Sequence, residues 1–394
     1  MRVLHVTPYF APAFCYGGPP RSIFGLSRNL QRVGVAVQVF TTTANGKTDL
    51  PPSHPTGDRY EGIPVRYFPR IFPRRLFSAA SLASTLATTI CEYDLVHLHG
   101  LWNLPIWQAA RYARWFGIPY VISPRGMLER AAVAQQQCRK HLAYWLIERR
   151  NLTGAAFLHA TSAAEAYHLQ RYNLQVPVIT LPNGIEIRER PAISLSSFRQ
   201  RLGLGTSTKI VTFIGRLHAI KRIDLLIAAF RQVQEQLPNA HLVIAGPEEP
   251  GVASSVWRRG DNVNPAVHWL GEVNEEEKWS LLSESTAFVL CSDSESFGLS
   301  VVEAMAAGVP VVVTRTCPWQ EIETVGCGLW VPQERDAVAS ALHWLLTHPI
   351  EAQQMGTRGK DLARTRYAWE PIARTMAASY ANTLADCPRV QLAS

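Results

Sequence analysis

An alternation of apolar strands and amphipathic helices runs twice along this chain, and it limits the possible folds more than any other feature. RVLHVTPYF is followed by the helical pattern SIFGLSRNLQRVG and then by the strand pattern VAVQVFTT, and the same rhythm starts again at KIVTFIGR. Repeated strand–helix–strand units build parallel sheets with helices on both faces. The sequence therefore predicts an α/β fold made of two doubly wound domains.

The two rhythms are separated by LPNGIEIRERPAISLSS, which is rich in turn formers and charge. We place the domain boundary there, so that residues 1–184 form the first domain and residues 185–370 the second. A length of 394 residues suits two domains, and a hydrophobic content of 47% gives each of them a core.

The net charge of +8 is unevenly distributed. Residues 1–185 contain 19 Lys and Arg against 8 Asp and Glu, whereas the rest of the chain contains 20 against 23. This asymmetry predicts that the first half meets an anionic partner, although a basic surface that serves only solubility is the alternative. We expect no nucleic acid, because no zinc finger, basic helix or repeated basic–aromatic motif is visible.

Targeting and cysteine patterns point to the cytoplasm. MRVLHVTPYFAP lacks the layout of a signal peptide, and no apolar run reaches the roughly 18 residues of a membrane-spanning helix. Seven scattered cysteines contain no CxxC pair, so no zinc or redox site is expected.

Candidate binding residues lie where strands end, which is where parallel sheets bind ligands. In SDSESFGLSVVEAMAAGVP, Glu295 follows a strand and Glu303 lies about one turn into a helix. Gly298 has no side chain, so the backbone can approach a ligand closely there. The amides of Phe297, Gly298 and Leu299 are predicted to bind sugar or phosphate oxygens. The alternative is two solvated acids near a helix start, which the helix dipole favours.

A second motif, FIGRLHAIKRIDLL, places Gly215 and Arg216 at a strand end and Lys221 just before a helix. An arginine fork and a lysine point charge suit a pyrophosphate. The pattern is not a Walker loop, which argues against ATP hydrolysis. Two solvated cations are the alternative.

The strand YDLVHLHG carries His97 and His99, which we expect to point to opposite faces and therefore not to share a metal ion. His99 would bind a sugar hydroxyl and His97 would be a core residue. In CYGGPPRSIF, Gly17 and Gly18 open a loop that departs from GxGxxG, so dinucleotide binding is not expected. This loop would approach a phosphate or an acceptor, or it is a plain turn.

Taken together, these motifs resemble glycosyltransferase family 4, the retaining, nucleotide-sugar-dependent transferases of the GT-B fold, in which two Rossmann-like domains face each other across a deep cleft. The resemblance rests on GRLHAIKRIDLLIAAF, ESFGLSVVE and AMAAGVPVV, in that order. SPRGML and CPWQEIETVGCGLWV are similar to a bacterial surface-polysaccharide branch of the family.

The resemblance implies an enzyme that moves a sugar from a UDP- or GDP-sugar to a hydroxyl of a glycan, without a metal ion or other cofactor. It implies a catalytic group of His99, Arg216, Lys221 and Glu295, and an acceptor site with Gly18 and Arg125. It also implies a helix at about residues 371–387 that returns to the first domain. The implied donor-binding residues are Gly17, Gly18, Gly215, Arg216, Lys221, Gly271, Val273, Glu295, Phe297, Gly298, Leu299 and Glu303.

Two positions depart from the family pattern: Pro247 follows Gly246 where a second glycine is usual, and Arg222 replaces the glycine that usually follows the lysine. These departures affect the predicted phosphate contacts. A nucleotide-sugar epimerase and a non-catalytic sugar-binding protein remain as alternatives.

The stretch VRYFPRIFPRRLFSAASLASTLATTI mixes arginines with aromatic residues. Such a mixture suits an anionic bilayer surface. We therefore expect a peripheral enzyme at the inner face of the membrane that extends a lipid-linked glycan, against the alternative of a basic loop that leads into a soluble helix. The residues concerned are Arg66, Tyr67, Phe68, Arg70, Phe72, Arg74, Arg75 and Phe77.

Overall fold

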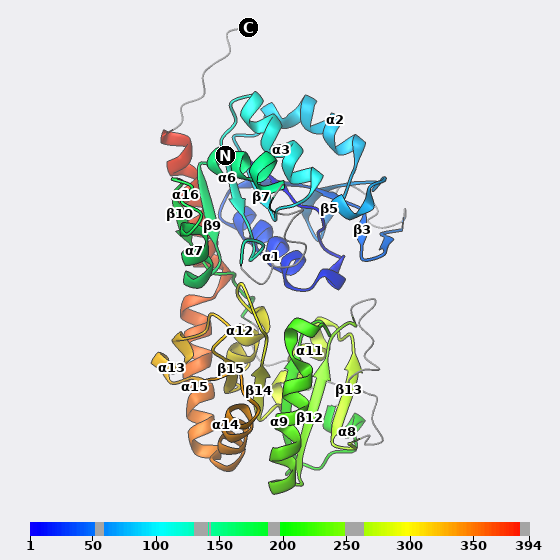
Figure 1. Ribbon diagram of the computed structural model, residues 1–394, viewed down its shortest axis with the longest axis vertical. Helices are drawn as coiled ribbons and strands as arrows, with labels where there is room; N and C mark the ends of the chain where they lie inside the picture. Colours follow the sequence, from blue (N-terminus) through cyan, green and yellow to red (C-terminus); the bar gives the residue numbers. More distant parts are fainter. Residues whose placement is uncertain (52–58, 130–140, 142, 188–197, 249–263, 387–394) are drawn as a thin grey trace. The chain divides into compact units, whose positions relative to one another are not determined.

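The chain forms two compact units in the computed structural model (Figure 1). Unit 1 comprises residues 1–184 and 369–394, and unit 2 comprises residues 185–368. The structure describes residues 1–51, 59–129, 141, 143–187, 198–248 and 264–386.

Unit 1 contains an eight-stranded sheet in the order β10-β9-β8-β7-β1-β2-β6-β5. Neighbouring strands in it are parallel except β5 and β6, and β3 pairs with β4 in a separate antiparallel ribbon. The strands are β1 (Arg2–Val6), β2 (Ala36–Thr42), β3 (Ala44–Asn45), β4 (Thr48–Asp49), β5 (Arg59–Tyr60), β6 (Ile63–Phe68), β7 (Leu95–His99), β8 (Tyr120–Ser123), β9 (Phe157–Ala160) and β10 (Val178–Thr180).

Successive residues of each strand supply two different cores, one on each face of this sheet. Val3 and Leu95 pack with helices α1 and α16 on one face, while Leu4 and Val96 pack with α2, α3 and α7 on the other. The helices of unit 1 are η1 (Phe14–Tyr16), α1 (Gly18–Arg32), η2 (Arg74–Leu76), α2 (Ala80–Thr89), η3 (Ile90–Glu92), α3 (Leu104–Trp115), the π-helical turn η4 (Tyr144–Glu148), α6 (Arg149–Thr153), α7 (Ala163–Gln170) and α16 (Trp369–Asp386).

Unit 2 contains a six-stranded parallel sheet in the order β13-β12-β11-β14-β15-β16. Its strands are β11 (Lys209–Ile214), β12 (Ala240–Ala245), β13 (Val267–Gly271), β14 (Ala287–Leu290), β15 (Val311–Thr314) and β16 (Gly328–Val331). Its helices are α8 (Phe198–Arg201), η5 (Ala219–Lys221), α9 (Ile223–Gln236), α11 (Glu275–Glu284), α12 (Leu299–Ala306), α13 (Glu321–Val325), α14 (Arg335–Thr347) and α15 (Pro349–Arg366).

The predicted α/β class with parallel, doubly wound sheets is confirmed. The predicted loop before the first helix is too long, since α1 already begins at Gly18. Pro19 and Pro20 fit its first turn, where a missing N–H costs no intrahelical bond. Among the described residues, no helix combines the length and apolar character needed to cross a bilayer.

Candidate functional site

At the carboxyl ends of β11 and β14, Lys221 and Glu295 form an ion pair between Nζ and Oε1. Lys221 closes the short helix η5, and Glu295 lies in the loop after β14. The hydroxyl of Ser292 donates to the same Oε1 of Glu295 at 2.8 Å. Two residues that the sequence assigned to one site are therefore in direct contact.

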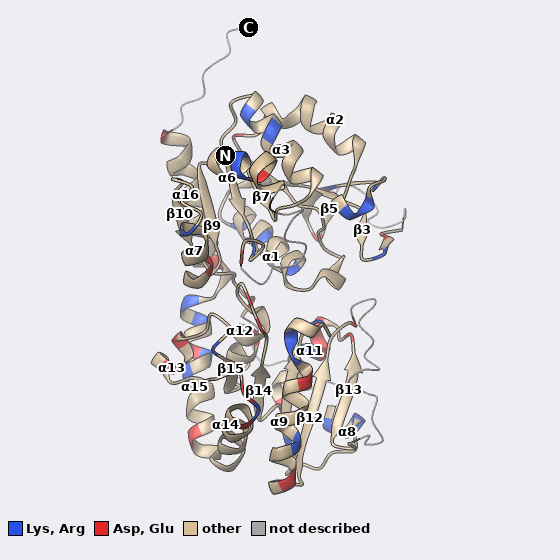
Figure 2. Ribbon diagram, viewed as in Figure 1, with Lys and Arg blue, Asp and Glu red and all other residues tan. Residues whose placement is uncertain are grey.

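The second predicted acid, Glu303 on α12, has a different cationic partner. Nζ of Lys278 lies 2.5 Å from Oε1 of Glu303 and 3.0 Å from a carboxylate oxygen of Glu275. Lys278 belongs to the charged start of α11 (Figure 2) and is buried. Glu295 and Glu303 thus have separate lysine partners. Sequence reasoning missed Lys278, because a lysine after three glutamates is typical of a solvated helix end.

The start of α12 has the backbone geometry expected of a binding turn. Gly298 is the N-cap, with φ of 89° and ψ of 68°, a conformation that other residues adopt only with strain. Phe297 is buried, and its carbonyl accepts a hydrogen bond of 2.6 Å from the indole of Trp319. Leu299 is the first helical residue, so the amides here begin the helix and have no intrahelical acceptors.

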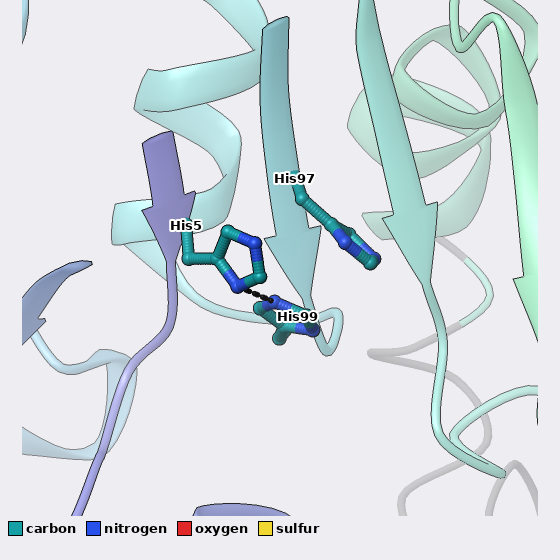
Figure 3. A group of neighbouring side chains, drawn as sticks. All are labelled: His5, His97 and His99. Carbon is teal, nitrogen blue, oxygen red and sulfur yellow. Dashed lines mark hydrogen bonds between the residues drawn. The ribbon is translucent and has the colours of Figure 1, made fainter. Parts of the chain in front are cut away.

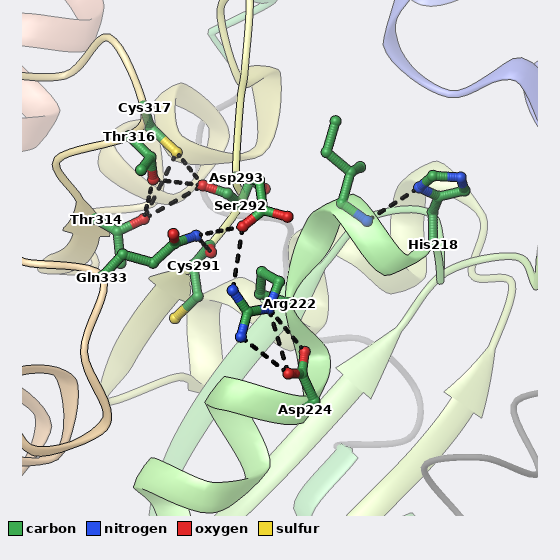
Figure 4. A network of polar contacts seen from close by, with 11 residues as sticks. His218, Arg222, Asp224, Cys291, Ser292, Asp293, Thr314, Thr316, Cys317 and Gln333 are labelled. Atoms are coloured by element: carbon green, nitrogen blue, oxygen red, sulfur yellow. Dashed lines mark hydrogen bonds and ion pairs between the residues drawn. The ribbon is translucent and has the colours of Figure 1, made fainter. Parts of the chain in front are cut away.

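Arg222, which departs from the family pattern, adopts the left-handed conformation with φ of 50° and ψ of 47°. This geometry explains why glycine is usual at the position. The guanidinium contacts Asp224 at 3.1 Å and Asp293 at 3.2 Å, as Figure 4 shows. Arg222 therefore links the start of α9 to the loop after β14.

Two further hydrogen bonds join these loops. The amide of Asp293 donates to the carbonyl of Ile220 at 2.7 Å, and Nε2 of Gln333 donates to Oδ1 of Asp293 at 2.9 Å (Figure 4). Lys221 and Glu295 are consequently held by backbone and side-chain contacts on both flanks of their ion pair.

The remaining predicted donor residues of unit 2 also lie at strand ends. Gly215 follows β11 and packs against Gly246 so closely that a Cβ on Gly246 would lie 1.9 Å from the carbonyl oxygen of Gly215. The amide of Gly246 donates to the carbonyl of Gly271 at 2.7 Å. Arg216 lies next to Gly215, and Val273 lies in the turn between β13 and α11.

In unit 1, Gly17 is the N-cap of α1 with φ of 83°, and its amide donates to the carbonyl of Phe14 at 2.8 Å. Gly18 is the first residue of the helix. Pro19 and Pro20 follow, so the first turn lacks two of the amides that a phosphate would use. This feature weakens the phosphate interpretation of the Gly-Gly turn relative to a contact with an acceptor.

The expectation that His97 and His99 point to opposite faces is wrong. Residues two apart on a strand share a face, and the two ring centroids lie 4.1 Å apart. His5 from the neighbouring strand joins them, and Figure 3 shows the three rings together. All three lie on the face that packs against α1 and α16.

His97 is a satisfied core residue in a chain of hydrogen bonds. His159 Nε2 lies 2.8 Å from the carbonyl oxygen of Leu181, which fixes the proton on Nε2 and makes Nδ1 an acceptor. Ser123 then donates to His159 at 2.7 Å and accepts from Nε2 of His97 at 2.7 Å. His97 Nδ1 is left to accept from the hydroxyl of Tyr380 on α16, at 2.6 Å.

His99 belongs to a second chain. Arg125 is left-handed, with φ of 55°, and its guanidinium donates to Ser22 at 2.8 Å and to Nδ1 of His99 at 3.2 Å. His99 Nε2 then donates to Nδ1 of His5 at 3.1 Å. Within the described part of the chain, this leaves Nε2 of His5 as a buried atom without a hydrogen-bond partner.

Burial and nearby positive charge keep these rings neutral. Desolvation, reinforced by Arg125, lowers the pKa of His5 to about 3, and desolvation lowers the pKa of His159 to about 4. The pKa values of His97 and His99 lie well below the usual value for the same main cause, burial. Burial also lowers the pKa of Arg125 to about 10, which leaves it charged at neutral pH.

His5, His97 and His99 have nitrogens within 4.8 Å of one another, a spacing that a metal ion could use. However, both nitrogens of His97 and of His99 already have hydrogen-bond partners, and the Arg125 cation contacts His99 directly. The geometry therefore favours a hydrogen-bonded cluster over a metal centre.

The basic–aromatic segment around β6 and η2 is only partly available to a membrane. Arg70 is buried and pairs with Asp49 at 2.8 Å, and Phe68 is a core residue. Phe72, in contrast, is 88% exposed, and the neighbouring Ile71 is 46% exposed. The exposed apolar part of the predicted surface thus lies at Ile71 and Phe72.

Two family models match the chain. "Glycosyl transferase 4-like domain" matches residues 17–184, and "Glycosyl transferases group 1" matches residues 196–362. The D-inositol 3-phosphate glycosyltransferase of Segniliparus rotundus is 25% identical over 96% of this chain and 87% of its own length.

Solved structures share the fold. Sucrose-phosphate synthase from Thermosynechococcus elongatus matches with a TM-score of 0.77 and 21% identity, over 98% of this chain and 99% of its own. The Anabaena protein HepE, in complex with UDP-glucose, matches with a TM-score of 0.74 and 21% identity, over 97% of this chain and all of its own.

Proposed function

Since the chain is a glycosyltransferase of family 4 with the GT-B fold, we propose that it transfers a sugar from a UDP- or GDP-sugar to a hydroxyl group of a glycan with retention of configuration. The observation that carries this proposal is the meeting of Lys221 and Glu295 at the carboxyl ends of β11 and β14. The transferase family sets aside the epimerase and sugar-binding alternatives.

In this proposal Arg216 and Lys221 bind the donor diphosphate together with the amides of Phe297, Gly298 and Leu299. The bond between C1 of the sugar and the diphosphate oxygen breaks, and its electron pair stays on the diphosphate. The acceptor oxygen bonds to C1 from the same face, and its proton passes to the departing phosphate oxygen. Because the cations and amides neutralise the leaving group, the proposal needs no metal ion.

Separate parts of the donor have separate partners. Glu303 accepts the ribose hydroxyls, Glu295 contacts the sugar, and the turn from Gly271 to Val273 lies along the base. Lys221 and Lys278 already neutralise the two carboxylates. A bound donor must therefore compete for Lys221, which suits a site that binds a dianion and releases it again.

Unit 1 supplies the acceptor side, with Gly17, Gly18 and Arg125. His99 is neutral and hydrogen-bonded through both nitrogens, so its part in this proposal is to hold Arg125 and not to abstract a proton. The relative from Segniliparus rotundus is named for a phosphorylated acceptor, which supports an anionic group near Arg125.

The test is a panel of UDP- and GDP-sugars, with thermal shift as a readout of binding and release of free nucleotide as a readout of turnover. We expect one nucleotide series to raise the unfolding temperature, and Lys221→Ala to reduce both the shift and the turnover. Equal thermal shifts for the Lys221→Ala variant and the natural chain would contradict the assignment of the diphosphate site.

We also propose that the acceptor is linked to a lipid and that the enzyme works at the inner face of the membrane, through the exposed tip of Ile71 and Phe72 with Arg74 and Arg75 beside them. Flotation with vesicles that contain phosphatidylglycerol tests this idea. Phe72→Ser should weaken binding, whereas Trp115→Ser, another exposed aromatic position of unit 1, should not. Absence of flotation at low salt would rule the membrane proposal out.

A further inference from the structure

Unit 1 contains a pocket of about 430 Å³ that no part of the proposed mechanism uses. Its volume lies in the range of small-molecule sites. Among the described residues the lining combines four aromatic residues, two arginines and no acid, and consists of Trp102, His141, Tyr144, Trp145, Arg149, Arg171, Tyr172 and Asn173.

The backbone beside the pocket is unusual at two places. Trp102 adopts a left-handed conformation with φ of 61°, which costs a bulky residue energy. Tyr144–Glu148 forms a π-helical turn, a feature often found at functional sites. Both are held by buried Glu148, whose Oε1 accepts from the amide of Trp102 at 2.5 Å and from the indole of Trp107 at 2.7 Å.

These contacts fix the aromatic rings that line the pocket. The indole of Trp102 donates to the carbonyl of Met127 at 3.2 Å, and the hydroxyl of Tyr172 donates to the carbonyl of Leu128 at 3.1 Å. The rings of Tyr144 and Tyr172 lie 5.3 Å apart. Trp145, in contrast, remains 57% exposed, so a large apolar face stays open to a ligand.

The charges of the pocket are unbalanced. Arg149 lies over the ring of Trp145 at 5.4 Å, and Arg171 is exposed. Within the described residues neither arginine forms an ion pair with a carboxylate. A guanidinium next to an aromatic face, with no ion pair to a carboxylate in the described residues, favours a ligand that has both a flat apolar surface and a negative charge.

We propose that this pocket binds a sugar ring that carries a carboxylate or phosphate group, as one residue of the acceptor glycan; this inference rests on the proposed function. The C–H groups of a pyranose pack on aromatic faces, and the arginines bind the anion. Trp102 lies three residues after His99, so the pocket continues from the carboxyl end of β7. The concave shape argues for a single ring over a flat lipid surface.

Binding to the full chain is tested with four probes: glucuronic acid, glucose 6-phosphate, glucose and inorganic phosphate. Saturation-transfer NMR and titration calorimetry serve as readouts. We expect both anionic sugars to bind, with glucose and inorganic phosphate at least about tenfold weaker, because each lacks one of the two contacts. Equal binding of glucose and glucuronic acid would overturn the proposal.

Four variants locate the site. Trp145→Ala should weaken both anionic sugars, and Arg171→Ala should weaken them about tenfold while leaving glucose unchanged. Trp115→Ala and Arg111→Ala are matched controls, since both residues are exposed on α3 and neither lines the pocket. If the control variants lose sugar binding, or if the pocket variants keep it, the assignment of the site is wrong.

Two measurements on the same samples keep the proposals apart. UDP and GDP binding should be unchanged in Trp145→Ala and Arg171→Ala. If the protein binds a nucleotide but binds neither anionic sugar, the pocket proposal is wrong and the proposed function is unaffected. Vesicles of phosphatidylglycerol should float equally with all variants. If the pocket variants lose vesicle binding and no sugar binds, the pocket is a lipid surface and the inference is wrong.

Discussion

The two units place polar side chains at the same end of similar sheets but satisfy them differently. In unit 1 the buried histidines are neutral and bonded in chains that run from α16 to β9 and from Arg125 to β1. In unit 2 the polar groups are paired charges, Lys221 with Glu295 and Lys278 with Glu303. Neutral, hydrogen-bonded chains make a rigid scaffold, whereas paired charges can exchange one partner for a charged ligand.

The sharpest test of this difference is acidification. Four buried histidines of unit 1, His5, His97, His99 and His159, have depressed pKa values in the folded state. Below pH 6.5 the unfolded chain therefore binds more protons than the folded one, and stability falls as pH falls. Each histidine contributes up to about 1.4 kcal/mol per pH unit below about 6.5. The loss continues towards pH 4, where His159 begins to titrate in the folded state.

Hydrogen exchange at pH 7.5 and 5.5, analysed unit by unit and corrected for intrinsic rates, measures this effect. We expect protection to fall mainly in unit 1. In unit 2 burial also lowers the pKa values of His241 and His268, but these residues are partly exposed and should contribute less. An equal loss of hydrogen-exchange protection in both units would contradict the difference between them.

The next largest effect is expected at Lys221. Its replacement by Ala removes a cation from the leaving group and should lower kcat by about 10²–10³-fold. Lys360→Ala is a matched control, because Lys360 is an exposed lysine of the same unit. Steady-state kinetics at saturating donor provide the measurement, and a similar decrease in the control would remove the special role of the ion pair.

Tyr380→Phe tests the scaffold of unit 1. The substitution leaves Nδ1 of buried His97 without its donor, which should destabilise the protein by about 1–3 kcal/mol. Tyr167→Phe, at a 61% exposed position of the same unit, should have almost no effect. Urea unfolding compares the two variants, and an unchanged midpoint for Tyr380→Phe would show that the hydrogen-bond chain adds nothing to stability.

The smallest effect is expected at Arg222. Arg222→Ala loses the contacts with Asp224 and Asp293 and keeps the left-handed strain, whereas Arg222→Gly loses the same contacts and relieves the strain. The glycine variant should therefore be more stable than the alanine variant by about 1 kcal/mol. An alanine variant of equal or greater stability would contradict this account.

The sequence predicted the parallel sheets and several residues of the candidate site, but it did not predict every contact between them. The βα rhythm predicts parallel strands, and strand ends bring Lys221 and Glu295 together because their strands β11 and β14 are neighbours. Lys278 could not be predicted, since its contact with Glu303 depends on how α11 packs beside α12. The error at His97 and His99 came from the period of a strand, which returns to the same face after two residues.

Backbone conformation was the second feature that could not be predicted from the sequence. The unusual Arg222 was visible as a departure from the family pattern, but its left-handed geometry and its contact with Asp293 came only from the structure. Likewise, the arginines and aromatic residues around β6 suggested one continuous surface, whereas Arg70 is buried against Asp49, which is distant in sequence.

The position of helix α16 in the chain affects how this protein folds during its synthesis. Its residues Trp369, Ile372, Met376 and Tyr380 complete the core between α1 and the sheet of unit 1. During translation the first 184 residues emerge with that side of the sheet covered by α1 alone, because all of unit 2 is made before α16. The nascent chain therefore presents an apolar surface to chaperones while unit 2 is being made, and its first unit is completed last.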